Sequence, residues 1–146
     1  MGNAQTAQEY FGALDRTDFD AARSMMTDDF TFSGPVPEPI DGDGFLGLTR
    51  AISVGFPDWR FRASGFQEDG DVVHLTVEVG GTHTGTLSLP FLGIPDVPAT
   101  GIAARNPVEP TDLTFRAGKI ANLHADVGAD GGVAGILGQI GVQPPS

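Results

Sequence analysis

Two short stretches of the sequence combine residue types that can transfer protons. Gly81-Thr82-His83-Thr84-Gly85 holds one of the three histidines, and His124-Ala125-Asp126 holds another together with a carboxylate. Both stretches fit β-strands, in which residues two apart point to the same face. An imidazole and a carboxylate on the wall of one cavity can act as general acid and base. We therefore take His83 and Asp126 as the candidate catalytic residues.

Asp126 is the first candidate for the acid/base. On an extended strand it shares a polar face with Asn122 and His124, while the apolar residues between them share the other face. The apolar face is the one expected to contact the core. The polar face lines a cavity only near the open end of a curved sheet, or where a β-bulge redirects it. Burial there would raise the pKa of Asp126 and suit it to acid/base catalysis, and the alternative is an exposed aspartate beside a loop.

The histidines differ in their surroundings. His83 follows Gly80-Gly81, which bends a long strand and allows close approach of a ligand, so its imidazole could donate to a carbonyl or enolate oxygen. The alternative is a partly buried histidine satisfied by a neighbouring threonine. His124 is a candidate for positioning the substrate, and we assign His74 to an outer face. No histidine has the spacing of a metal-ligand motif, so we expect no metal.

Composition limits the class of protein. The 146 residues fit a single domain, 1–146, and the absence of cysteine excludes disulfides and thiolate chemistry. The formal net charge of -11, with 8 basic residues, argues against binding to nucleic acid or to anionic lipid surfaces. No apolar run approaches the length of a membrane-spanning helix. We expect a soluble, cytoplasmic protein.

The first third of the chain has helical patterns. Apolar residues at helical spacing predict a helix over residues 7–14, and Asp18 is placed to cap a second helix that buries residues up to Met26. Residues 30–32 alternate as a short strand. Residues 37–44 are expected to form a loop at the edge of a cavity, and 45–56 a third helix that ends at Pro57.

The remainder alternates as strands. We expect strands over residues 59–63 and 73–79, with a turn at Asp69-Gly70 between them. The second strand is expected to continue beyond a bend at Gly80-Gly81, through His83 to Leu89. The proline-rich residues 90–110 are predicted to form a long loop, either a lid or an insertion. Further predicted elements are strands at 113–115 and 120–127, a helix from Val133 to Ile140 and a disordered tail at 143–146.

Helices followed by antiparallel strands predict an α+β fold. We expect a cone-shaped domain in which the N-terminal helices pack on a strongly curved antiparallel sheet and enclose a pocket for a small molecule. Trp59 and the neighbouring aromatic residues are expected to form core and cavity wall, so Trp59 is a candidate substrate contact.

Several motifs make the whole chain similar to a known family. The generic pieces are Asp28-Asp29-Phe30-Thr31-Phe32 and Phe56-Pro57-Asp58, and the more specific ones are Gly81-Thr82-His83-Thr84-Gly85 and the closing Gly135-Ile136-Leu137 with Gln139-Ile140-Gly141. With these pieces the chain resembles the SnoaL-like polyketide cyclases of the nuclear transport factor 2 superfamily.

The resemblance implies a mechanism. In that family an aspartate on the last long strand is the acid/base of an intramolecular aldol closure that uses no metal or organic cofactor. His124-Ala125-Asp126 matches the family's His-x-Asp when one extra residue is allowed after Gly118-Lys119-Ile120, and this implies that Asp126 has the catalytic role. By the same resemblance His83 is the second site residue and Asp112 a substrate contact. Asp130 is the alternative carboxylate.

These observations lead to one expected function and two alternatives. We expect a cyclase or isomerase that acts on a small apolar or aromatic carbonyl compound without a cofactor. The first alternative is a non-catalytic ligand-binding or dimerisation module, because one fold hosts many functions. The second is a dehydratase or hydrolase of the same superfamily. We also expect a homodimer formed through the convex face of the sheet.

Overall fold

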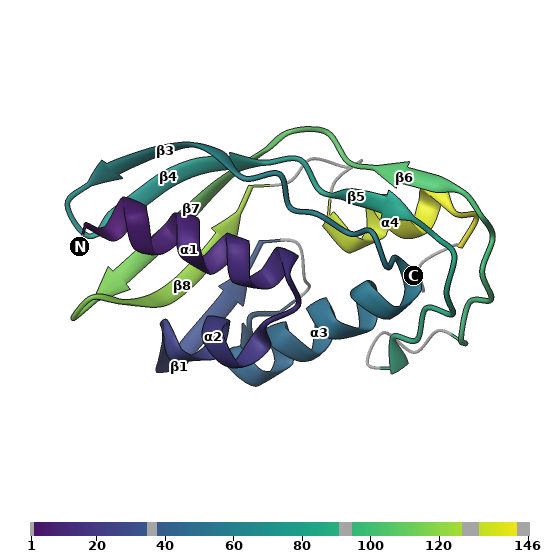
Figure 1. Ribbon diagram of the computed structural model, residues 1–146, viewed down its shortest axis with the longest axis horizontal. Helices are drawn as coiled ribbons and strands as arrows, with labels where there is room; N and C mark the ends of the chain where they lie inside the picture. Colours follow the sequence, from purple (N-terminus) through teal and green to yellow (C-terminus); the bar gives the residue numbers. More distant parts are fainter. Residues whose placement is uncertain (1, 35–37, 91–94, 127–131, 143–146) are drawn as a thin grey trace.

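The computed structural model describes residues 2–34, 38–90, 95–126 and 132–142. Its elements form a strongly curved sheet whose inner face is covered by three helices, with a fourth helix at one end (Figure 1). This arrangement confirms the predicted α+β fold. The predicted tail at 143–146 and the alternative carboxylate Asp130 lie outside the described residues.

The three N-terminal helices follow their sequence patterns. They are α1 (Asn3–Asp15), α2 (Phe19–Ser24) and α3 (Gly42–Gly55). Asp18 caps α2 as predicted, because its side chain accepts a hydrogen bond of 3.2 Å from the backbone N–H of Ala21. The prediction that Met26 belongs to this helix is wrong, since the helix ends at Ser24 and Met26 begins a strand. Residues 37–44, predicted as a loop, include a short strand and the start of α3.

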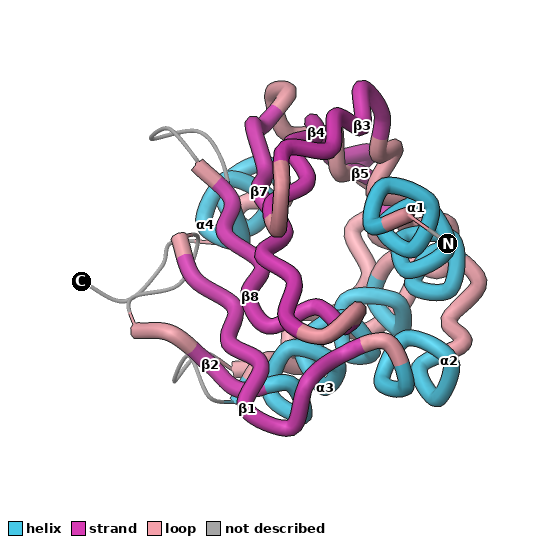
Figure 2. Tube along the Cα trace, turned by 90° about the vertical axis from the view of Figure 1, so that its left-hand side faces the viewer, coloured by secondary structure: helices cyan, strands magenta, loops and turns pink. Residues whose placement is uncertain are grey.

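Six strands make up the main sheet. In spatial order they are β2 (Ile40–Asp41), β1 (Met26–Ser33), β8 (Lys119–Ala125), β7 (Glu109–Arg116), β4 (Val72–Val77) and β3 (Ser64–Asp69). Figure 2 shows this sheet bending around an interior that α1, α2 and α3 close from the other side. The sheet is mostly antiparallel. This agrees with the predicted curved antiparallel sheet, and the one parallel pair among the described strands is β1 with β8.

The core lies between the concave face of the sheet and the helices. Its fully buried residues include Tyr10, Phe30, Phe56, Val73, Leu113 and Ile120. Burial of this apolar surface is the main source of stability for a domain of this size. The same concave face carries the candidate site at its open end.

A second, two-stranded sheet extends the domain beyond β4 and β7. It consists of β5 (Gly80–Thr82) and β6 (Ala103–Arg105). The prediction of a loop across 90–110 is therefore wrong, since β6 lies inside it and β7 already begins at Glu109. Ala103–Arg105 has little intrinsic preference for a strand, so its conformation comes from pairing with β5.

Residues 59–63 do not form the predicted strand. Their backbone makes one bridge, between Arg60 and Gly80, and Phe61 accepts a hydrogen bond from Glu78. Arg62 has a φ of 48°, a left-handed conformation that cannot continue a β-ladder. The strand predicted to run through His83 to Leu89 likewise stops at Thr82.

The last described helix, α4 (Gly132–Gln139), confirms the helix predicted near the C-terminal end. It lies beside β6 at one end of the domain (Figure 1). No helix in the described residues is both long enough and apolar enough to cross a membrane.

Candidate functional site

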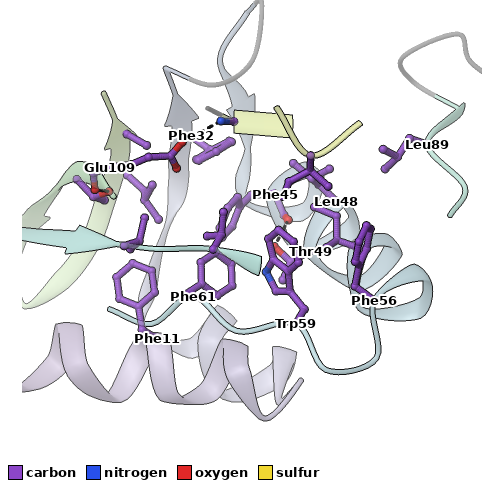
Figure 3. Close-up of a pocket in the computed structure, with 18 of the residues that line it drawn as sticks. Phe11, Phe32, Phe45, Leu48, Thr49, Phe56, Trp59, Phe61, Leu89 and Glu109 are labelled. Atoms are coloured by element: carbon purple, nitrogen blue, oxygen red, sulfur yellow. Dashed lines mark hydrogen bonds between the residues drawn. The ribbon is translucent and has the colours of Figure 1, made fainter. Parts of the chain in front are cut away.

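A small cavity lies at the open end of the concave face, between the sheet and helices α1, α3 and α4 (Figure 3). Its volume is about 80 Å³, below the roughly 300–1,000 Å³ of a typical ligand pocket, so a ring-shaped ligand requires lining side chains to shift. Most of its wall is apolar or aromatic. The lining residues are Phe11, Phe32, Phe45, Leu48, Thr49, Ile52, Phe56, Trp59, Phe61, Val77, Val79, Leu87, Leu89, Glu109, Thr111, Leu123, Ala125, Gly132 and Ile136.

Glu109 brings a carboxyl group into this apolar wall. Along β7 every second residue is buried, and this alternation places Glu109 and Thr111 on the concave face in line with Leu113. Glu109 is only 5% exposed. Among the described residues that line the cavity, it is the one with an ionisable side chain. The described wall of the site therefore carries one ionisable group.

Two opposing effects act on the Glu109 carboxyl group. Burial raises its pKa, whereas a hydrogen bond from the backbone N–H of Gly132 to Oε2, at 2.9 Å, lowers it; the net shift is upward. The bond to Gly132 also fixes the orientation of the group. No described residue bonds to Oε1, which leaves that oxygen available to a ligand. A raised pKa brings a carboxyl group closer to the range in which it both accepts and returns protons.

Hydrogen bonds of two side chains, Asn106 and Gln139, hold helix α4 over the cavity. Asn106 is 2% exposed, donates from Nδ2 to the carbonyl of Gly132 at 2.8 Å, and accepts at Oδ1 from Gln139 Nε2 at 3.1 Å. Gln139 also accepts a hydrogen bond of 2.7 Å from the backbone N–H of Arg105. These bonds hold both ends of α4 and so position Gly132 beside Glu109.

Two threonines and one tryptophan are the other polar side chains of the cavity. Thr49 donates to the carbonyl of Phe45 at 3.0 Å, and Thr111 donates to the carbonyl of Glu109 at 3.2 Å. Trp59 is 7% exposed, and its Nε1 has no hydrogen-bond partner among the described residues. The cavity thus combines one carboxyl group with one unpartnered N–H.

The structure does not place Asp126 in the cavity. Its side chain is exposed, and its backbone N–H donates to the carbonyl of Pro110 at 2.8 Å. A bulge in β8, between the pairs Phe115–Ile120 and Thr114–Asn122, precedes it. This bulge leaves Ala125 on the concave face, where it lines the cavity. The expectation that Asp126 faces the cavity is wrong.

The other polar residues predicted on or beside the last strand also lie on the convex face. His124 Nδ1 is 2.9 Å from Ser33 Oγ, and Asn122 Nδ2 donates to Thr31 Oγ1 at 2.9 Å. Asp112 is half-exposed and lies 2.6 Å from Nδ1 of His74, and this hydrogen bond raises the pKa of His74. The placement of Asn122, His124 and Asp112 on the substrate cavity is therefore wrong, whereas that of His74 on an outer face is confirmed.

His83 is fully buried but does not line the cavity. Its ring stacks on Phe56, a cavity residue, with the ring centres 5.1 Å apart. Nδ1 lies 2.9 Å from Thr100 Oγ1 and 3.3 Å from the backbone N–H of Thr100, as in the alternative of a histidine satisfied by a neighbouring threonine, and Nε2 has no partner among the described residues. His83 thus lies one side chain away from the cavity, behind Phe56.

The glycines on either side of His83 serve close packing. A Cβ on Gly85 would lie 2.1 Å from the carbonyl oxygen of Val54, and a Cβ on Gly81 would lie 3.1 Å from the Cβ of Phe56. Gly85 also donates a backbone hydrogen bond of 3.0 Å to Gly55. The two glycines therefore let the backbone of residues 81–85 pass directly over the end of α3. Their role is in packing, whereas the sequence interpretation expects them to allow close approach of a ligand.

Glu109 is the residue that the sequence interpretation missed. Leu113 begins the predicted strand, and extending its alternation backwards by two steps reaches Thr111 and Glu109 on the same face. Pro110 concealed this signal, because proline is uncommon inside a strand. In the structure Pro110 is exposed and faces away from the cavity.

Comparison with known families agrees with this fold. The SnoaL-like domain profile matches residues 7–123, which is most of the chain. The protein belongs to the SnoaL-like family. No match was found among curated proteins.

Solved structures show the same fold at low identity. IdmH from Streptomyces antibioticus, a proposed polyketide cyclase, is 21% identical with a TM-score of 0.73 over 97% of this chain and 100% of its own. AclR from Streptomyces galilaeus, a proposed hydroxylase, is 19% identical with a TM-score of 0.74 over 98% and 87%. An NTF2-like protein from Cytophaga hutchinsonii is 16% identical with a TM-score of 0.60 over 86% and 88%. Similar architectures with different assignments mean that function must be argued from the site.

Proposed function

We propose that this protein is a cyclase or isomerase that acts on a small, largely apolar carbonyl compound through acid/base chemistry at Glu109. The observation that carries the proposal is a buried carboxyl group in an apolar cavity, held by Gly132 and with a raised pKa. Family membership supports the same class of reaction. The proposal places the acid/base at Glu109 on β7, whereas the sequence interpretation favours Asp126, which directly follows β8.

The proposed chemistry needs one proton acceptor and a dry environment. Oε1 of ionised Glu109 removes a proton from the carbon next to a carbonyl group, and the electron pair moves to the carbonyl oxygen as an enolate. In a cyclisation the enolate carbon attacks a second carbonyl carbon, and the alkoxide oxygen formed there takes the proton from Glu109. In an isomerisation of an unsaturated carbonyl compound, the dienolate takes the proton from Glu109 at its γ-carbon. The aromatic wall excludes water, which would otherwise protonate the enolate.

Exchange of carbon-bound hydrogen tests the proposal without knowledge of the natural substrate. Wild-type protein in heavy water should exchange the acidic hydrogens of indanone, tetralone or methyl acetoacetate at least about a hundredfold faster than an equal concentration of free glutamate. Proton NMR measures the loss of signal. Methyleneindane, which has the shape of indanone without its oxygen, should slow the exchange by occupying the cavity. Exchange no faster than the free amino acid for all three compounds would contradict the proposal.

A ligand-binding module without catalysis is the second candidate. The mostly apolar cavity favours it, because such a site can hold a ligand without reaction. The two functions separate in the same experiment. Saturable binding of indanone without hydrogen exchange would favour the binding module.

We also propose a homodimer that forms through the convex face of the sheet. The convex face of the sheet carries an exposed row of polar side chains that includes His74 and His124, and this face is open to a second copy. Sedimentation at micromolar concentration should give twice the chain mass of 15.2 kDa. A monomeric mass would contradict the proposed dimer.

A further inference from the structure

The geometry points to the indole N–H of Trp59 as the group that binds the carbonyl oxygen of the substrate. This inference rests on the proposed function for the class of ligand. It adds the residue that orients the ligand relative to Glu109. It also predicts that the cavity distinguishes a ketone from a hydrocarbon of the same shape.

Trp59 has a buried hydrogen-bond donor, its indole N–H, that no described residue accepts from. Trp59 is only 7% exposed, and its Nε1 has no hydrogen-bond partner among the described residues. Buried N–H groups are almost always hydrogen-bonded, and an indole nitrogen can only donate. The missing partner must therefore be an acceptor. Trp59 lines the cavity, so a ligand that enters it can supply that acceptor.

The protein neighbours of the indole are aromatic and offer little to its N–H. Phe56 and Phe61 both meet the Trp59 ring edge to face, with ring centres at 5.6 Å and 6.2 Å. Figure 3 shows the indole lying between these two rings in the wall of the cavity. A phenyl face is at best a weak acceptor. A carbonyl oxygen would be a stronger partner in the same place.

The other donors of the cavity wall are already committed. The hydroxyl groups of Thr49 and Thr111 donate to backbone carbonyls, and the N–H of Gly132 donates to Glu109. Among the described lining residues, this leaves Trp59 as the uncommitted donor. His83 Nε2 is also unpartnered, but His83 does not line the cavity.

The two polar groups have complementary roles toward a carbonyl compound. Ionised Glu109 can accept a proton and cannot donate, whereas the indole of Trp59 can donate and cannot accept. When Glu109 removes a proton, negative charge develops on the carbonyl oxygen. A donor already placed at that oxygen stabilises the charge in a cavity from which water is excluded. The preferred ligand is thus a flat apolar molecule in which a carbonyl oxygen, placed at Trp59, lies next to an acidic C–H.

The chain has one tryptophan, so one indole N–H signal reports directly on this contact. We would follow that signal by NMR in nitrogen-labelled protein during titration with indanone and, separately, with methyleneindane. Indanone should move the indole proton downfield, and the hydrocarbon should not, although both enter the cavity. Equal movement with both ligands, no movement with bound indanone, or no binding of indanone at millimolar concentration would overturn the inference.

Trp59→Phe supplies the matching variant. Loss of the donor should weaken indanone binding about tenfold and leave methyleneindane binding within about twofold, as measured by calorimetry. Equal weakening for both ligands would instead indicate a role in shape alone and would overturn the inference. A thermal unfolding transition shows whether the variant is folded. If it is not folded, the NMR titration of the wild-type protein tests the Trp59 contact by itself.

The outcome for Trp59 is separable from that for the proposed function. A protein that shows the downfield indole shift with indanone but does not exchange its hydrogens would refute acid/base catalysis and retain the Trp59 contact. Hydrogen exchange without the indole shift would support acid/base catalysis and refute the Trp59 contact.

Discussion

Replacing Glu109 with glutamine is expected to slow hydrogen exchange and any cyclisation by about 10²–10⁴-fold, the usual contribution of a positioned general base. Glutamine has nearly the same shape and its amide oxygen can still accept the hydrogen bond from Gly132, so α4 should stay in place. What is lost is the ability to take up a proton. Proton NMR of the exchange reaction measures the rate.

Asp126→Asn is the matched control. It makes the same chemical change at an exposed carboxylate outside the cavity and should leave the rate unchanged. If Asp126→Asn abolished exchange and Glu109→Gln did not, the acid/base would be the residue favoured by the family resemblance, and the assignment of Glu109 would be wrong.

The pH dependence follows from the same residue. Only the ionised form of Glu109 is a base, so the exchange rate should rise with pH through a midpoint above the ordinary value of 4.5. Its effect on folding has the opposite sign. Because the folded state holds this proton more tightly than the unfolded state, the stabilisation is complete below 4.5 and is lost as pH rises through the folded-state pKa. Glu109→Gln should remove that loss in denaturant titrations across this range.

Gly85→Ala is expected to lower the free energy of unfolding by about 2–4 kcal/mol, through overpacking and a lost hydrogen bond. The new Cβ would lie 2.1 Å from the carbonyl oxygen of Val54, which is backbone and cannot rotate away. Separation of the two segments would also break the bond between Gly85 and Gly55. Thermal unfolding should show a midpoint lowered by about 10 °C for a domain of this size.

Gly47→Ala provides the control in the neighbouring helix. Gly47 lies at an exposed position of α3, and a Cβ there would meet no atom within 4 Å. Alanine is the better helix former, so this change should stabilise the domain by about 0.5–1 kcal/mol. A destabilised Gly47→Ala, or an unchanged Gly85→Ala, would contradict the packing role assigned to the motif.

Local patterns predicted the elements better than they predicted the site. The spacing of Tyr10, Phe11 and Leu14 and the cap at Asp18 depend on neighbouring residues, and both were confirmed. The orientation of β8 follows from the bulge near Asn122, which depends on pairing with β7. Sequence alternation alone correctly grouped Asn122 with Asp126. It did not decide which face of the strand meets the cavity.

Long-range contacts determined what the sequence could not. β6 is a strand because β5 lies beside it, and Glu109 becomes a buried acid because α4 covers the end of β7. Neither partner is near in sequence. The His83 motif was recognised correctly as a special feature, but its glycines fit the close approach to α3, a contact that no local pattern reveals.

The hydrogen bond between Glu109 and Gly132 couples the charge of the base to the seating of a helix. This bond favours the ionised carboxylate, so by reciprocity ionisation favours the docked position of α4 by the same free energy. In the proposed reaction, each proton that Glu109 takes from a ligand would weaken the bond to the first residue of α4, and the bond would recover when the proton is returned. The covering helix would then be bound most tightly before proton transfer and most loosely while the enolate is present.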